Sequence, residues 1–94
     1  MEKFLVKIKK LKIERERNFL LDAFEKEQKY IAQNDKQALT GLIIRLNGLY
    51  DGLSEDAQQL TKLLIQNIQQ EENRIWAFML KRAITKQMIH KSVD

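Results

Sequence analysis

Cysteine and proline are both missing from this chain of 94 residues, and glycine occurs only three times. The absence of cysteine excludes a disulfide scaffold, a thiol nucleophile and a cysteine-based zinc site. It also suits the reducing conditions of the cytoplasm. Strand-rich domains need turn residues about every 8–12 positions. The scarcity of glycine and proline therefore favours helices over sheet, and we expect an all-α fold.

Long hydrophobic runs are missing as well. No apolar stretch approaches the roughly 18–20 residues that a membrane-spanning helix requires. Near the N-terminus, lysines such as Lys3, Lys7 and Lys9 interrupt the apolar residues, which is not typical of a signal peptide. These features predict a soluble, cytoplasmic protein.

Groups that could support catalysis are few. His90 is the single histidine, and no Glu-x-x-His spacing precedes it. Adjacent acids such as Glu71 and Glu72 diverge around a helix rather than converge on one point. Neither a calcium-binding loop nor a glycine-rich phosphate loop is present. We therefore expect no enzyme activity, no cofactor and no metal site.

The charges divide the chain into three parts. Residues 1–17 carry seven basic and three acidic side chains, residues 18–73 carry five and nine, and residues 74–94 carry five and one. Two basic ends, each with a net charge of +4, therefore flank a middle of −4. This pattern is typical of contact patches for an anionic partner. Alternatively, the oppositely charged segments complement each other within the fold or between copies of the chain.

The centre of the chain has the clearest helical pattern, which predicts an amphipathic helix over residues 36–50. Its apolar stripe contains Leu39, Leu42, Ile43 and Leu46. Asp35 is well placed to be the N-cap of this helix. Gly41 lies inside the helix, where glycine costs up to ~1 kcal/mol relative to alanine. Close contact with another helix is one explanation for this glycine.

Helical periodicity resumes after the Asp51-Gly52 turn signal and predicts helices over residues 55–72 and 73–91. Ser54 is a good N-cap, because its hydroxyl can accept hydrogen bonds from the amides of the first turn. The apolar stripe keeps its phase across residues 69–73, and no glycine or proline forces a break there. We therefore interpret the two segments as one continuous or kinked helix.

The first 33 residues are compatible with a strand or with a helix. A strand over residues 4–10 followed by two helices would resemble the layout of the ribbon-helix-helix DNA-binding proteins over residues 4–50, although strand alternation fails at Lys10. Helical spacing accounts for more residues and predicts one helix over residues 3–33 with two apolar stripes. One stripe contains Phe4, Ile8, Leu11, Phe19 and Ala23, and the other contains Val6, Ile13, Leu20, Phe24 and Ile31.

We expect these helices to form a single domain over residues 1–94, a three- to four-helix antiparallel bundle with long first and last helices. The helices of residues 36–50 and 55–72 can cover one stripe of the first helix, so the other needs the last helical segment, a second copy or another protein. The sequence thus predicts a small non-catalytic interaction module that binds a protein partner, as an oligomer. The candidate contact residues are Val6, Ile13, Leu20, Phe24, Trp76 and Leu80. Tryptophan is enriched at interfaces, but beside other apolar residues on a helix it is more often part of the core.

Nucleic-acid binding through the basic ends is the main alternative. The candidate contacts are Lys7, Lys9, Lys10, Lys12, Lys81, Arg82 and Lys86. Phosphate binding needs several cations on one surface, and on a first helix these lysines point in different directions. Membrane-surface binding is disfavoured, because Val6 and Ile13 spoil a single apolar face.

Overall fold

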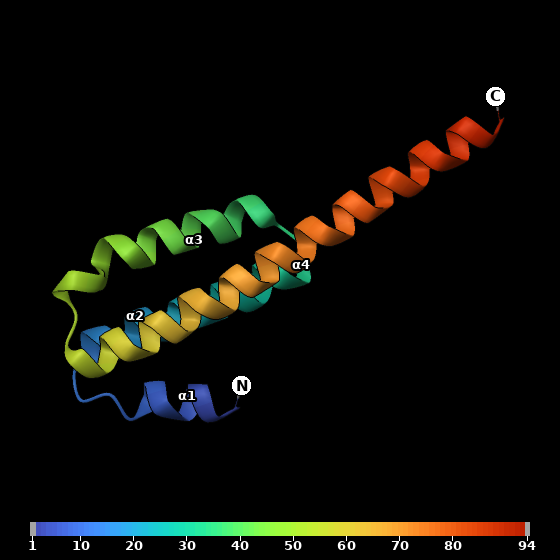
Figure 1. Cartoon of the computed structure of the whole chain (residues 1–94). Helices are drawn as coiled ribbons and strands as arrows, with labels where there is room; N and C mark the ends of the chain where they lie inside the picture. Colours follow the sequence, from blue (N-terminus) through green and yellow to red (C-terminus); the bar gives the residue numbers. More distant parts are fainter. Residues whose placement is uncertain (1, 94) are drawn as a thin grey trace.

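The computed structural model describes the backbone of residues 2–93 and the side chains of residues 3–86. Its elements are α1 (Glu2–Lys9), α2 (Glu14–Ala32), α3 (Lys36–Leu49), a 3₁₀ turn η1 (Tyr50–Gly52) and α4 (Glu55–Val93). No strand occurs within residues 2–93. The described chain is therefore all-α, as the composition predicted, and the strand that the ribbon-helix-helix layout requires is replaced by α1 (Figure 1).

The single helix predicted over residues 3–33 is wrong, because α1 ends at Lys9 and the chain turns back before α2 begins at Glu14 (Figure 1). The reversal needs no glycine or proline. The Arg17 guanidinium donates a hydrogen bond of 2.7 Å to the carbonyl of Leu11, which the end of α1 leaves without a helical partner. Ile8 and Leu20, which the sequence placed on different stripes, are both fully buried in one core. A continuous helix would leave one of them in water, so burial of both favours the break.

The turn between α2 and α3 is built on Asn34, which has a φ angle of 51°. Its amide donates to the Ile31 carbonyl, and the next amide, of Asp35, donates to the Tyr30 carbonyl, each over 3.0 Å. This pair of bonds closes a helix C-terminus in the way that glycine usually does. The Asp35 carboxylate then accepts from the Ala38 amide over 3.0 Å. Asp35 is thus the N-cap of α3, as predicted.

In space, α2 and α4 run side by side, with α1 on one flank and α3 on the other (Figure 1). Both α1 and α3 pack against this central pair and do not contact each other. The largest fully buried apolar side chains come from every helix: Ile8, Leu20, Leu39, Leu46, Leu64, Ile68 and Ile75. The core is therefore one continuous layer along α2 and α4.

α4 is a single helix of 39 residues with no break at residues 69–73, the interpretation that the continuous stripe favoured. At about 1.5 Å per residue it is long enough to account for most of the longest dimension of the molecule, 63 Å. The other helices are shorter, so the last part of α4 extends past all of them (Figure 1).

Gly41 does not make the close helix contact that the sequence suggested. A Cβ atom added at this position would have nothing within 4 Å, and the residue is exposed.

Within the described residues, no helix combines the length and the apolar character needed to cross a membrane.

Candidate interaction site

The strongest candidate site is the part of α4 that leaves the core. Among the side chains that the structure describes, Ile75 is the last buried one of α4, with 1 % of its surface exposed. Ten large apolar side chains are exposed within residues 3–86, and five of them come from the nine residues after Ile75: Trp76, Phe78, Met79, Leu80 and Ile84. We call residues 76–86 the α4 projection. Half of the exposed large apolar side chains in the described part of the chain thus lie on one short segment.

The exposure of Trp76 corrects the prediction that it is more often a core residue, since 55 % of its surface is accessible. The reason lies in its neighbours. Thr40 donates a hydrogen bond of 2.9 Å to Glu72, and the Lys36 ammonium lies 5.9 Å from the Trp76 ring. Lys36 is the first residue of α3, so α3 ends over Trp76 and covers nothing beyond it.

Four of the five large apolar side chains of the α4 projection share one side of the helix, whereas Phe78 lies on the other side. At about 100° per residue, Trp76, Met79, Leu80 and Ile84 fall within an arc of about 140°. This arc continues the face of α4 against which α3 packs. It therefore has the character of a helix-packing surface from which the neighbouring helix is missing.

The basic residues of the α4 projection gather on its other side. Lys81, Arg82 and Lys86 surround a surface hollow together with Phe78. The projection contains no acidic residue. It thus combines an apolar arc with a positively charged flank.

The second predicted contact surface, on the first helix, does not exist as one surface. Leu20 is fully buried, which removes it from the candidates. The ring of Phe24 is partly buried and lies 5.6 Å from the ring of Phe4, so α1 covers it. Val6 and Ile13 remain about half exposed. The helix break lies between them, since Val6 belongs to α1 and Ile13 is the N-cap residue of α2, and their shared phase on one helix therefore has no spatial meaning.

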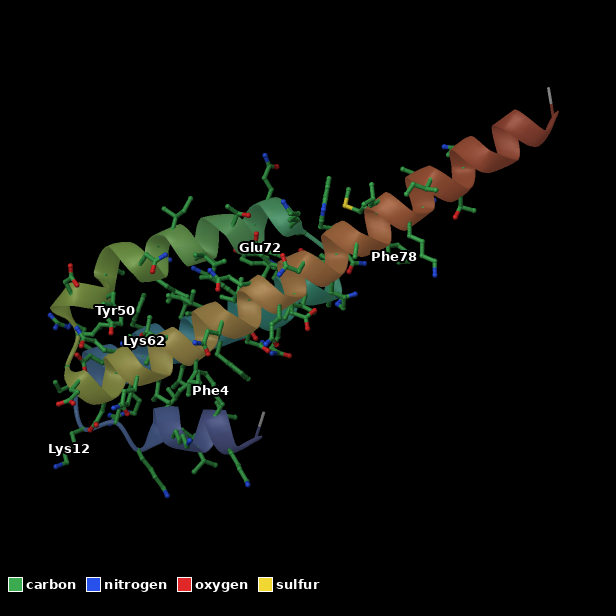
Figure 2. The ribbon with its side chains drawn as sticks, in the orientation of Figure 1. Phe4, Lys12, Tyr50, Lys62, Glu72 and Phe78 are labelled. Carbon is green, nitrogen blue, oxygen red and sulfur yellow. The ribbon has the colours of Figure 1, made fainter. Side chains whose placement is uncertain are left out.

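The candidate nucleic-acid contacts fall into two separate groups. Lys7, Lys9, Lys10 and Lys12 are exposed on α1 and the turn after it. Lys7 and Lys10 line a hollow that also contains Asp56. In Figure 2, Lys12 lies by the turn after α1, whereas Phe78 lies far from it along α4, and the second group surrounds Phe78. Among the described side chains, these two groups of lysine and arginine residues therefore do not share one surface.

Two buried acids were not predicted from the sequence. Glu16 and Glu27 are 2 % and 0 % exposed, and they occupy the same face of α2 as Leu20 and Ala23. The four residues follow the helical spacing i, i+4, i+7 and i+11, so each acid extends the buried stripe by one turn. This spacing is the signal by which both could have been found.

Glu16 stabilises the start of α4. Its carboxylate accepts hydrogen bonds of 2.6 Å from the backbone amide and from the hydroxyl of Ser54. Ser54 was predicted to accept hydrogen bonds through its hydroxyl, but this hydroxyl donates to Glu16 instead. A carboxylate at a helix N-terminus also interacts favourably with the helix dipole.

In Glu27, only one of the two carboxyl oxygens accepts hydrogen bonds from the described residues. One carboxyl oxygen, Oε1, accepts from Asn67 over 2.9 Å and from Gln28 over 3.3 Å, whereas the buried Oε2 has no hydrogen-bond partner among the described residues. Burial raises the pKa of the Glu27 carboxyl from 4.5 to about 7, although the hydrogen bond from Asn67 opposes the shift. A cleft of about 300 Å³ between α1, α2 and α4 includes Glu27 in its wall.

Comparisons with protein-family models, with curated proteins and with solved structures found no significant match. Within the described residues, no three His, Cys, Asp or Glu side chains are grouped so that they could hold a metal ion. The proposals below therefore depend on the geometry of the chain itself.

Proposed function

We propose that this protein is a non-catalytic interaction module of the cytoplasm, built as an antiparallel helical bundle, which binds another protein through the α4 projection. One observation carries the proposal: five large apolar side chains are exposed on a helix whose earlier turns are covered. Burying a large apolar side chain stabilises a complex by roughly 1.5–3 kcal/mol. A partner that covers the apolar arc would therefore gain most of its affinity from a few residues.

The charge of the α4 projection indicates the chemistry of the partner. Lys81, Arg82 and Lys86 lie beside the apolar arc, with no acid nearby on the projection. A groove that is apolar at its centre and acidic at its edges would complement this helix. Apolar side chains then supply affinity, and the opposite charges accelerate association and fix the orientation.

In the absence of that partner, we expect copies of the chain to associate through the same surface. Exposed apolar side chains of this size commonly cause self-association when nothing else covers them. The oligomeric state that we propose is therefore a consequence of the α4 projection rather than of the first helix.

Trp76 is the only tryptophan of the chain, so its fluorescence reports directly on this surface. We expect the scattering mass to exceed the monomer mass of 11.2 kDa as concentration rises, while Trp76 emission shifts to shorter wavelength. The double variant L80S/I84S should remain helical and monomeric. Ile44→Ser on α3 is the matched control, because Ile44 is 67 % exposed but lies outside the projection.

The same experiment can contradict the proposal. A wild-type monomer that binds an apolar dye, with dye binding lost in L80S/I84S, supports a separate protein partner. A monomer with solvent-exposed Trp76 emission and no dye binding would show that the apolar arc has no affinity for another surface.

Binding of single-stranded nucleic acid is a second candidate function. It is favoured by the position of Phe78 among three cations, because such proteins combine base stacking on aromatic rings with phosphate contacts. Its test is an electrophoretic shift that weakens with salt and disappears when Lys81, Arg82 and Lys86 become glutamine. Lys9, Lys10 and Lys12 changed in the same way provide the control for charge alone.

A further inference from the structure

The cleft between α1, α2 and α4 lies on a part of the molecule that the proposed function does not use. Its apolar walls include Phe4 from α1, Phe24 from α2 and Leu63 from α4. Leu63 is 47 % exposed, so the cleft is open to solvent beside these walls. An aromatic or aliphatic group of a small molecule would find apolar side chains from three helices here.

The wall of the cleft also contains a buried acid with a free hydrogen-bonding atom. Glu27 is 0 % exposed, and its Oε2 has no partner among the described residues. Leaving a buried oxygen in this state costs about 1–3 kcal/mol. Asn67 holds the other oxygen, which fixes the direction of the carboxyl group. Oε2 has almost no solvent-accessible surface, so a donor that binds it must displace the side chains that shield it, and it then recovers this cost.

Cations line the same cleft. Lys3 and Lys7 come from α1, and both are exposed. Neither forms an ion pair with Glu27 within 4.0 Å among the described residues. They would repel a ligand that carried only a positive charge, and they would attract an anionic group at its outer end.

We propose that this cleft binds a small zwitterionic molecule with an apolar body, whose ammonium group is bound by Glu27 and whose anionic group is bound by Lys3 and Lys7. The ammonium donates to the free Oε2 of the ionised carboxylate. The apolar body lies between Phe4, Phe24 and Leu63. Each part of the cleft thus has a chemical counterpart in the ligand.

The proposal implies a coupling to pH. The groups that face Glu27 are Lys3 and Lys7 of α1, Gln28 of α2, and Asn67 and Glu71 of α4. An ammonium ligand requires the ionised carboxylate, and burial raises the pKa of Glu27 to about 7. Affinity should therefore increase as pH rises from 6 to about 8, and binding below pH 7 should release a proton.

Three related probes test this on the full chain by NMR chemical-shift titration. The probe 4-(aminomethyl)benzoate has both charges, benzylamine lacks the carboxylate, and 4-methylbenzoate lacks the ammonium. We expect shifts around Phe24 and Asn67 with the first probe, and affinity weaker by roughly tenfold or more for each of the other two. Equal affinity for all three, or no shift at 20 mM of the first probe, would overturn the proposal.

Variants locate the two charged contacts. Glu27→Gln should remove the preference for the ammonium and the pH dependence, whereas Glu25→Gln, at an exposed neighbour, should change neither. Lys7→Ala should weaken the zwitterion but not benzylamine, with Lys9→Ala as the control outside the cleft. If Glu27→Gln binds all three probes as the wild type does, Glu27 is not the ammonium site and the proposal fails. None of these changes touches the α4 projection, so failure here leaves the proposed function standing.

Discussion

Replacing Glu27 with glutamine should change how the stability of the fold depends on pH. In the unfolded chain the carboxyl has an ordinary pKa of 4.5, and burial raises its pKa to about 7 in the folded chain. Between these values the folded state holds one more proton than the unfolded state, so stability falls as pH rises. Below pH 4.5 both states are protonated and ionisation of Glu27 adds no cost, whereas above pH 7 the full cost of ionisation applies.

The size of this effect follows from the shift. One pKa unit corresponds to 1.36 kcal/mol, so the rise in the pKa of Glu27 from 4.5 to about 7 predicts a cost of about 3 kcal/mol above pH 7. Glutamine has no charge to desolvate but retains an oxygen that can accept from Asn67. Its amide hydrogens lack an acceptor, which adds a cost that does not vary with pH. The informative quantity is therefore the change in the difference between variant and wild type from pH 5 to pH 8.5.

Urea denaturation followed by circular dichroism at several pH values measures this quantity. We expect the variant to gain up to about 3 kcal/mol on the wild type across the range, a relative midpoint shift of roughly 1–3 M. Glu25→Gln, at the exposed position two residues earlier, should show no such gain. A difference between variant and wild type that is the same at pH 5 and at pH 8.5 would refute the reasoning.

Three further predictions concern stability and can be checked by the same denaturation assay. Glu16→Ala should destabilise the fold by about 2–3 kcal/mol, because it removes both hydrogen bonds to Ser54. Ser54→Ala should cost less, since the backbone amide at this position keeps Glu16 as its partner. Equal costs would mean that the hydrogen bond from this amide contributes nothing to stability. Gly41→Ala should stabilise α3 by about 0.5–1 kcal/mol, because the added methyl meets no atom, and a loss of stability would reveal a hidden contact. Leu20→Ala should cost about 2–5 kcal/mol while Val6→Ala costs less than about 0.5, and the reverse order would contradict the burial of Leu20.

The elements that could be predicted from the sequence are those whose determinants are local. The helix of residues 36–49 was recognised from its stripe, and its N-cap from Asp35 directly before it. The phase of α4 was also readable, since a stripe that continues at seven-residue spacing needs no knowledge of its neighbours.

What could not be predicted depends on contacts between distant residues. The break before α2 follows from burying Ile8 and Leu20 in one core, and periodicity alone cannot weigh that gain against helix continuity. Likewise, Trp76 is exposed because α3 begins at Lys36, forty residues earlier in the chain. The candidate site was therefore identified in part, through Trp76 and Leu80, while its extent came from the structure.

The continuity of α4 also has a mechanical consequence. The hydrogen-bond ladder runs unbroken from the core to the projection, and an α-helix without a proline or a bulge resists sharp bending. A partner that holds the α4 projection at an angle must therefore tilt the whole of α4, and this tilt would pivot near the buried side chains of Ile68 and Ile75. Because cores are closely packed, this tilt would press on α3 and its contact with Glu72. A force applied to the α4 projection would thus be transmitted along α4 to the packing of the core.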